Sequence, residues 1–182
     1  TTTGWLKDGN TWYYLEESGK MATDWQYIDG VWYHLYSWRG MAEGWVLDND
    51  IWYYLDPASG AMQTGWKLLN GKWYYFYNWG GMAEGWVLDN GVWYYLDPIS
   101  GAMATGWKWI SGKWYYFYTW GGMAEGWVLD NGTWYYLDPE TGAMQTGWKW
   151  ISNKWYYLYT WGGMAYNTTI EGYVLGTDGA MR

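Results

Sequence analysis

The pattern of apolar and polar positions repeats along the chain with a fixed period. A Trp is followed seven residues later by a second Trp that opens an aromatic triplet, as in Trp86 and Trp93-Tyr94-Tyr95. A period of this length predicts stacked supersecondary units that share one continuous core, because each unit is too small to bury its own apolar face. The opening tryptophans of the eight pairs lie 20 or 21 residues apart, at Trp5, Trp25, Trp45, Trp66, Trp86, Trp107, Trp127 and Trp148.

Each repeat is predicted to be a β-hairpin with a two-residue turn. Pairs such as Asn90-Gly91 favour the positive φ of a type I′ turn, and the flanking segments are rich in Val, Ile, Trp and Tyr. The chain therefore predicts an all-β fold, a solenoid of tandem β-hairpins. The other turn pairs are Gly9-Asn10, Asp29-Gly30, Asn49-Asp50, Asn70-Gly71, Ser111-Gly112, Asn131-Gly132 and Ser152-Asn153.

Side-chain alternation divides each predicted hairpin into two faces. A two-residue turn places Trp86 opposite Tyr95 and Leu88 opposite Trp93, and it sets these four side chains on one face. This first face is almost wholly aromatic and apolar, so we expect it to hold any binding site. The second face mixes apolar and polar side chains, and it carries Val87, Asp89, Val92 and Tyr94.

The segments between hairpins carry two further signals. A Met stands four residues before each opening Trp after the first, as Met103 does before Trp107, and its flexible side chain suits both filling the gap between hairpins and flooring a pocket. Odd-numbered repeats end in loops such as Leu96-Asp97-Pro98-Ile99-Ser100-Gly101 and even-numbered repeats in an aromatic segment, so the full unit is a pair of repeats. The aromatic segments add four tryptophans, which either pack laterally or add a wall to every second pocket: Trp38, Trp79, Trp120 and Trp161.

Composition narrows the function classes. The net charge is −8 and the lysines are scattered singly, which argues against nucleic-acid binding. No apolar run approaches the roughly 18 residues that a membrane helix needs. The chain has one His and no Cys, and its carboxylates recur with the repeat as turn and surface residues, so we predict no catalytic residue, metal site or cofactor.

The aromatic face favours one ligand chemistry. A quarter of the residues are aromatic, almost all of them Trp and Tyr. Several such rings around a hollow attract a quaternary ammonium, which has no hydrogen to donate and is recognised by cation–π and methyl contacts. A single site is weak, but a row of sites gains avidity of roughly 10² to 10⁴ on a polymer that repeats the same headgroup.

These residues resemble a known family. The pattern of Gly85-Trp86, the triplet 93–95 and Gly101-Ala102-Met103 is similar to the choline-binding repeat of Gram-positive surface proteins and cell-wall hydrolases. The resemblance implies a left-handed superhelix of hairpins with choline between neighbours. It also implies a non-catalytic, extracellular, cell-wall-associated module that binds choline or phosphocholine of teichoic and lipoteichoic acids.

The family's pocket combines two Trp of one repeat with a Tyr of the next and a nearby Met. Carried over to this chain, the resemblance implies six cages: Trp25, Trp32 and Tyr54; Trp45, Trp52 and Tyr75; Trp66, Trp73 and Tyr95; Trp86, Trp93 and Tyr116; Trp107, Trp114 and Tyr136; and Trp127, Trp134 and Tyr157. The methionines expected beside them are Met62, Met82, Met103, Met123 and Met144.

Two junctions depart from this pattern. The wall expected to close Trp5 and Trp12 is His34, which predicts a weaker first site whose choline affinity falls as the imidazole becomes charged. At the other end Gly176 stands in the wall position after Trp148 and Trp155, so we expect that junction to be empty or capped. We accordingly divide the chain into eight repeats over residues 1–165 and a divergent capping segment over 166–182.

Two alternatives stay open at this level. A carbohydrate-binding module of the glucan type shares the hairpin period, but sugars also need polar groups around the aromatic platform. A purely structural spacer would leave the Trp pairs buried. We further expect the chain to be a piece of a longer, secreted protein with any catalysis in an N-terminal portion, and the sequence leaves open whether two stacks form a homodimer.

Overall fold

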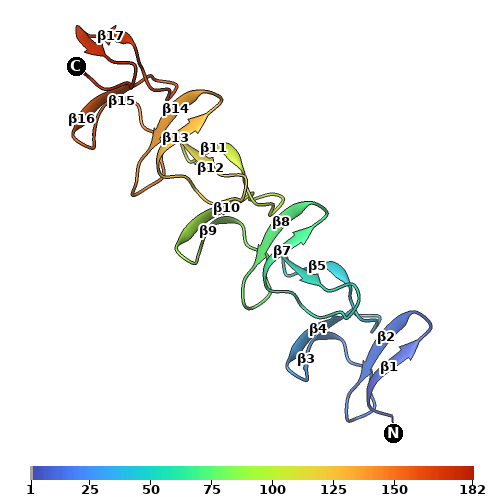
Figure 1. The fold of residues 1–182 in the computed structure, drawn as a ribbon. Coiled ribbons are helices and arrows are strands. Elements are labelled where there is room, and N and C mark those ends of the chain that lie inside the picture. The colour runs from blue at the N-terminus through green and yellow to red at the C-terminus, as the bar shows by residue number, and fades with distance from the viewer. Residues whose placement is uncertain (1) are drawn as a thin grey trace. The chain divides into compact units, whose positions relative to one another are not determined.

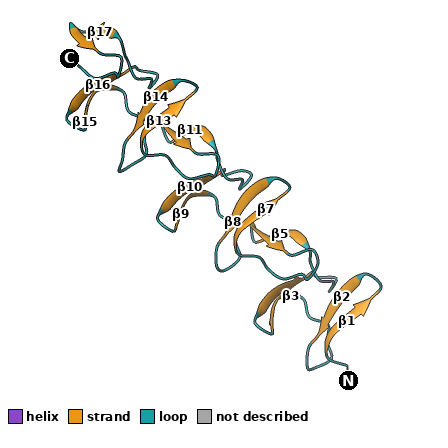
Figure 2. Cartoon of the chain, in the orientation of Figure 1, coloured by secondary structure: helices purple, strands orange, loops and turns teal. Residues whose placement is uncertain are grey.

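The computed structural model describes residues 2–182 and consists of tandem β-hairpins (Figure 1). Figure 2 shows strands joined by loops, with no helix in the described residues. Each hairpin is a two-stranded antiparallel sheet of consecutive strands. The strands are β1 (Gly4–Asp8), β2 (Thr11–Leu15), β3 (Asp24–Ile28), β4 (Val31–Leu35), β5 (Gly44–Asp48), β6 (Ile51–Leu55), β7 (Gly65–Leu69), β8 (Lys72–Phe76), β9 (Gly85–Asp89), β10 (Val92–Leu96), β11 (Gly106–Ile110), β12 (Lys113–Phe117), β13 (Gly126–Asp130), β14 (Thr133–Leu137), β15 (Gly147–Ile151), β16 (Lys154–Leu158), β17 (Thr168–Ile170) and β18 (Tyr173–Leu175).

The turn and the register match the sequence prediction. In the turn between β13 and β14, Asn131 has a φ of 47° and Gly132 a φ of 79°, as a type I′ turn requires. The strands pair with Trp127 opposite Tyr136 and Leu129 opposite Trp134. The prediction of an all-β fold of tandem hairpins is therefore confirmed.

The core lies on the second face of each hairpin. In β13 and β14 this face buries Val128 at 4% exposure and Leu137 at 0%, whereas Leu129 on the first face is 53% exposed. Leu137 and Val128 pack with Ala124 and with aromatic rings that include Trp107 of the preceding hairpin. The second face thus packs against the preceding hairpin, and the first face is turned toward the following one.

The methionines join successive hairpins through their backbone. Met123 forms an isolated bridge with Phe117 of its own hairpin, and its N–H donates a hydrogen bond to the carbonyl oxygen of Trp93 in the preceding hairpin at 2.8 Å. Met41 does the same with Leu35 and Trp12, at 2.8 Å. Met123 and Met41 are therefore each held beside the second Trp of the preceding pair.

The chain forms two compact units. The first spans Thr1–Gly85 and Leu96–Met103, and the second spans Trp86–Tyr95 and Ala104–Arg182. The second unit includes a ninth hairpin, β17 and β18, in the segment expected to be a divergent cap. Within residues 2–182 no helix is long and apolar enough to cross a membrane.

Candidate functional site

An aromatic cavity lies where the first face of one hairpin meets the second face of the next. In the second unit, Trp86 and Trp93 form two walls with ring centroids 6.2 Å apart and ring planes at 90°. Tyr115 of the following hairpin forms the third wall, 4.9 Å from Trp86 at 71°. With Met123 these rings line a cavity of about 330 Å³.

The contact between the opening Trp and the middle Tyr of the next triplet recurs within both units. The ring centroids are 4.8 Å apart for Trp5 and Tyr33, 4.7 Å for Trp25 and Tyr53, 5.0 Å for Trp45 and Tyr74, 4.7 Å for Trp107 and Tyr135, 5.0 Å for Trp127 and Tyr156, and 5.6 Å for Trp148 and Tyr173. The site is thus a property of the junction between two hairpins.

The tyrosines predicted as third walls lie elsewhere. Each packs against the opening Trp of its own hairpin, as Tyr136 does with Trp127 at 5.0 Å. Each predicted wall residue is one position too far along the sequence, because the prediction placed the closing Tyr on the same face as the Trp pair. A residue that closes the cage of the preceding hairpin must lie on the opposite face, where strand alternation puts the middle residue of the triplet. The residues corrected in this way are Tyr54, Tyr75, Tyr116, Tyr136 and Tyr157, and the structure places Tyr53, Tyr74, Tyr115, Tyr135 and Tyr156 against the preceding Trp.

The predicted methionines take up the expected positions. Met123 lines the cavity at Trp86, and Met144 lines the cavity at Trp107. Met62, Met82 and Met103 donate the same backbone hydrogen bond to Trp32, Trp52 and Trp73, at 2.9, 2.7 and 2.8 Å. The sequence prediction missed Met41 and Met181, which line cavities at the first and last junctions.

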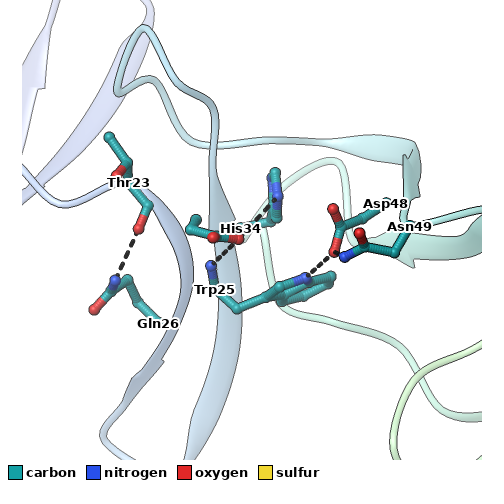
Figure 3. Close-up of polar contacts among 7 residues, drawn as sticks. Thr23, Trp25, Gln26, His34, Asp48 and Asn49 are labelled. Carbon is teal, nitrogen blue, oxygen red and sulfur yellow. Dashed lines mark hydrogen bonds and ion pairs between the residues drawn. The ribbon is translucent and has the colours of Figure 1, made fainter.

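Junctions of two kinds alternate within each compact unit. After even-numbered hairpins, a carboxylate of the next hairpin accepts a hydrogen bond from the indole N–H of the opening Trp, from Trp25 to Asp48 at 3.0 Å and from Trp107 to Asp130 at 3.2 Å. Figure 3 shows the first of these contacts. Burial and the Asp48 charge also raise the pKa of Tyr53.

After odd-numbered hairpins the corresponding side chain is apolar. Ile110 and Ile151 are buried at 8% and 7% exposure, and there the two cage tryptophans meet edge to face. Among the described residues no such contact joins Trp107 to Trp114. The carboxylate therefore selects a different position of the opening indole ring relative to the second Trp.

The loop after the second hairpin downstream adds a further wall to the cavity. The cavity at Trp107 measures about 280 Å³ and is also lined by Trp161, which stacks on Tyr159 at 13° and meets Tyr135 edge-on at 6.1 Å. For Trp161 this favours the alternative of an added wall, which the sequence left open beside lateral packing. At odd-numbered junctions the Asp-Pro loop takes this place, with Ala58 and Ser59 at the cavity of Trp5 and Trp12, and Glu140 and Thr141 at that of Trp86 and Trp93.

His34 does not close the first junction. The third wall beside Trp5 is Tyr33, and with Trp12 and Met41 it encloses about 270 Å³. His34 lies on the other face of its hairpin and packs edge-on against Trp25 at 4.9 Å (Figure 3). Burial lowers the pKa of the imidazole, an effect that the nearby charges of Asp48 and Asp24 oppose. The prediction that His34 weakens the first site as a wall is therefore wrong.

At the last junction Tyr173, and not Gly176, stands in the wall position. That this junction is empty or capped stays a prediction. Tyr173 of the ninth hairpin meets Trp148 edge-on at 5.6 Å. A cavity of about 460 Å³ is lined there by Trp148, Trp155, Glu171, Tyr173 and Met181. The segment lacks a Trp pair of its own, so only its second face takes part in a cage.

One predicted cage combines residues of the two compact units. Trp66 and Trp73 belong to the first unit and Tyr95 to the second. This cage stays a prediction.

Comparison with known families decides what these repeats are. A family model described as a choline-binding repeat matches residues 22–64, 63–105 and 104–146. The chain belongs to the choline-binding repeat family. A second model, described as a putative cell wall binding repeat, matches residues 3–21 and 146–164 of this choline-binding repeat protein. Both descriptions are of binding repeats, so the chain is a binding module.

Three solved structures resemble this choline-binding repeat protein. CbpJ from Streptococcus pneumoniae TIGR4 is 42% identical with a TM-score of 0.91, and the match covers 94% of this chain and 62% of CbpJ. Choline binding protein F from Streptococcus pneumoniae, solved with a peptidoglycan analogue, is 43% identical with a TM-score of 0.86, over 94% of this chain and 61% of that one. The choline-binding domain of CbpL from Streptococcus pneumoniae is 35% identical with a TM-score of 0.77, over 100% of this chain and 98% of that domain. This chain therefore spans about three fifths of the length of CbpJ and choline binding protein F. No match was found among curated protein sequences.

Proposed function

We propose that the chain anchors a surface protein or wall hydrolase to phosphocholine on teichoic and lipoteichoic acids, by holding choline headgroups in the cages between consecutive hairpins. The observation that carries the proposal is the three-ring enclosure of Trp86, Trp93 and Tyr115, floored by Met123. The proposed setting is the extracellular cell wall.

The cage chemistry fits a trimethylammonium group. Two indole faces at 90° and a phenol ring offer three π surfaces to one cation, and each such contact contributes roughly 0.5 to 2 kcal/mol. Three contacts give a binding free energy of about −4 kcal/mol, which corresponds to a dissociation constant of about 1 mM. The cavities of about 270 to 330 Å³ at Trp5, Trp107 and Trp86 are each lined mainly by aromatic rings and a Met.

Repetition converts these weak sites into an anchor. Ring contacts of the same type recur at the junctions of Trp5, Trp25 and Trp45 in the first unit. A polymer that carries many phosphocholine groups can occupy several junctions at once, with a gain of roughly 10² to 10⁴ where the geometry allows simultaneous binding. The affinity for the polymer should therefore far exceed the affinity for free choline.

The ligand class is tested by following tryptophan fluorescence and thermal unfolding against three compounds: choline, its neutral isostere 3,3-dimethylbutanol and a glucan oligosaccharide. We expect choline to raise the melting temperature in a concentration-dependent way, because it binds only the folded junctions. An equal response to dimethylbutanol would exclude a charge-based mechanism. A response to the oligosaccharide alone would identify a carbohydrate module.

The polymer partner needs a separate test. We expect the module to sediment with cell walls whose teichoic acids carry phosphocholine, and excess free choline should release it. Equal retention by walls stripped of phosphocholine would contradict the proposed anchor while leaving choline binding intact.

A further inference from the structure

The second hairpin, β3 and β4, departs from the other Trp-pair hairpins at two neighbouring positions. Asp24 has a φ of 69° where those hairpins have a Gly, such as Gly44 and Gly106 with φ values of 72° and 69°. His34 stands where the third residue of the triplet is otherwise a Tyr, as Tyr116 is in the sixth hairpin. A non-Gly residue at such a φ is strained, so this backbone bears a strain that places a carboxylate beside the imidazole.

The imidazole of His34 is enclosed by acidic and aromatic groups. The residue is 9% exposed, and its Nε2 atom lies 3.8 Å from Oδ1 of Asp24. The other titratable groups that face it are the carboxylate of Asp48 on β5 and the phenol of Tyr36, whose ring lies 5.7 Å away. Its Nδ1 atom is buried and has no hydrogen-bond partner within residues 2–182. Because the charged imidazole carries an N–H on both nitrogens, protonation adds a charge and an N–H without an acceptor to a nearly closed site.

The same imidazole contacts a wall of the second junction. The rings of His34 and Trp25 meet at 4.9 Å with planes at 71° (Figure 3). From the next hairpin, Tyr53 meets the Trp25 ring at 4.7 Å, and Asp48 accepts the indole N–H at 3.0 Å. One indole ring therefore contacts both the titratable His34 and the third wall of the cage.

The Trp107 junction has the same arrangement without an imidazole. Trp107 meets Tyr135 at 4.7 Å, and its indole N–H donates to Asp130 at 3.2 Å. Tyr116 takes the place of His34, with its ring 5.1 Å from that of Trp107 at 65°. The Trp107 junction is therefore a matched reference, with the carboxylate and the aromatic walls but no side chain that titrates near neutral pH.

We propose that the second junction is a proton-linked choline site, in which protonation of His34 weakens choline binding and bound choline opposes protonation. This inference rests on the proposed function, in which the cages hold the cationic headgroup. The imidazolium and the ammonium carry the same charge and lie against the same indole ring, so each raises the free energy of the other. Because such coupling is reciprocal, the two affinities change by the same factor.

The surroundings of His34 set the pH range of the effect. Burial lowers the pKa of the imidazole below its ordinary value of 6.5, and the charges of Asp48 and Asp24 act in the opposite direction. The neutral imidazole, and with it the full choline affinity, therefore prevails above pH 6.5. The affinity falls as the pH drops through the lowered pKa.

The linkage is measured first on the imidazole itself. The chain has one His, so the Cε1–H signal of His34 needs no assignment in the NMR spectrum. This signal is followed against pH in saturating choline and in the same concentration of sodium chloride. We expect choline to lower the proton affinity of His34 about fivefold, as two like charges across a partly solvated junction would.

The reciprocal effect is measured on the indole N–H signals in ¹⁵N-tryptophan NMR, which are identified by their loss in Trp25→Phe and Trp107→Phe. Choline affinity at Trp25 should fall about threefold between one pH unit above and one pH unit below the measured pKa of His34. The affinity at Trp107 should stay constant over the same range.

Two variants test the role of the imidazole. His34→Tyr installs the residue found in the sixth hairpin and should remove the pH dependence at Trp25. Asp24→Gly keeps His34 but removes a carboxylate that favours its charge, so the same dependence should move to lower pH. A His34 titration unchanged by choline, or equal pH dependence at Trp25 in the wild-type protein and His34→Tyr, would overturn the inference. If choline shifts neither indole signal at any pH, the proposed function fails instead.

Discussion

Trp107 and Tyr135 belong to consecutive hairpins, and their rings meet at 4.7 Å with planes at 62°. The Tyr lies on the second face of its hairpin and the Trp on the first face of the preceding one. Neither hairpin alone contains both walls, so the binding unit is the junction.

Removal of the third wall should weaken the junction specifically. Tyr135→Ala deletes one π surface from the cage of Trp107 and Trp114, and we expect choline affinity there to fall about tenfold. Choline titration followed on the Trp107 indole N–H signal measures this loss. Tyr136→Ala is the matched control, because Tyr136 packs on Trp127 of its own hairpin, and it should change the same affinity less than twofold. The reverse order of the two variants would assign the third wall to Tyr136.

Much of this arrangement follows from the sequence. The Trp period, the Asn-Gly turns and the alternation of Val128 and Leu129 are local signals, and they predict the hairpins and their register. The same local signals predict the Trp pairs and Met123, and Met123 lines one cavity with Trp86 and Trp93.

The remaining features depend on how one hairpin docks on the next. Tyr135, rather than Tyr136, closes the cage because the second face of each hairpin packs against the preceding hairpin. The residue pattern within one hairpin does not specify which neighbour each face contacts. The bond from Trp107 to Asp130 depends on a side-chain rotamer, which a residue pattern does not specify. The ninth hairpin was missed because residues 168–175 lack the Trp pair that marked the other repeats.

The carboxylate behind Trp107 should set the position of its ring. Asp130→Leu converts this junction to the apolar kind found at Ile110 and Ile151, and we expect the Trp107 indole to lose its acceptor and move toward Trp114. The indole N–H signal should shift upfield, and unfolding should cost about 1 kcal/mol less, the usual contribution of one hydrogen bond. Asp130→Asn keeps an acceptor and should retain most of the wild-type shift. Identical spectra of Asp130→Leu and the wild-type protein would show that Asp130 does not set the position of the Trp107 ring.

The core position in each hairpin should dominate stability. Leu137 is 0% exposed, and Leu137→Ala should destabilise the protein by about 2 to 5 kcal/mol through lost burial and a cavity. Leu129 in the same hairpin is 53% exposed, and Leu129→Ala should cost less than about 0.5 kcal/mol. Denaturant unfolding measures both values. Similar costs for the two variants would show that the second face is not the core.

Gly142 lies in a loop and affects the cage at Trp86 through Met123. Its φ is 74°, and a Cβ at this position would collide with the thioether of Met123, which lines the cavity at Trp86. Gly142→Ala should therefore both strain the backbone and displace Met123, weakening choline binding on the Trp86 signal several-fold. Gly132→Ala is the control, since its φ of 79° gives similar strain but no side chain lies nearby. Equal binding losses in the two variants would remove Met123 from the explanation.

His34 should make stability depend on pH, independently of the first cage. Burial lowers its pKa below the ordinary value of 6.5, so the unfolded chain binds the proton more readily than the folded chain. Above pH 6.5 the imidazole is neutral in both the folded and the unfolded chain, and the folded state has its full stability. That stability should fall as the pH drops from 6.5 toward the lowered pKa of the folded state. The two carboxylates that face it, Asp24 and Asp48, reduce the effect. Thermal unfolding at pH 7.5 and pH 5 should show a larger drop for wild type than for His34→Tyr, and equal drops would refute the assignment.

The most direct test of the central claim is a crystal structure of the protein with choline. The account predicts the ammonium nitrogen within about 6 Å of the ring centroids of Trp107, Trp114 and Tyr135, with Met144 beside it. Equivalent density should lie between Trp86, Trp93 and Tyr115. Choline bound against Tyr136 on a single hairpin, or cages left empty while choline binds elsewhere, would contradict it.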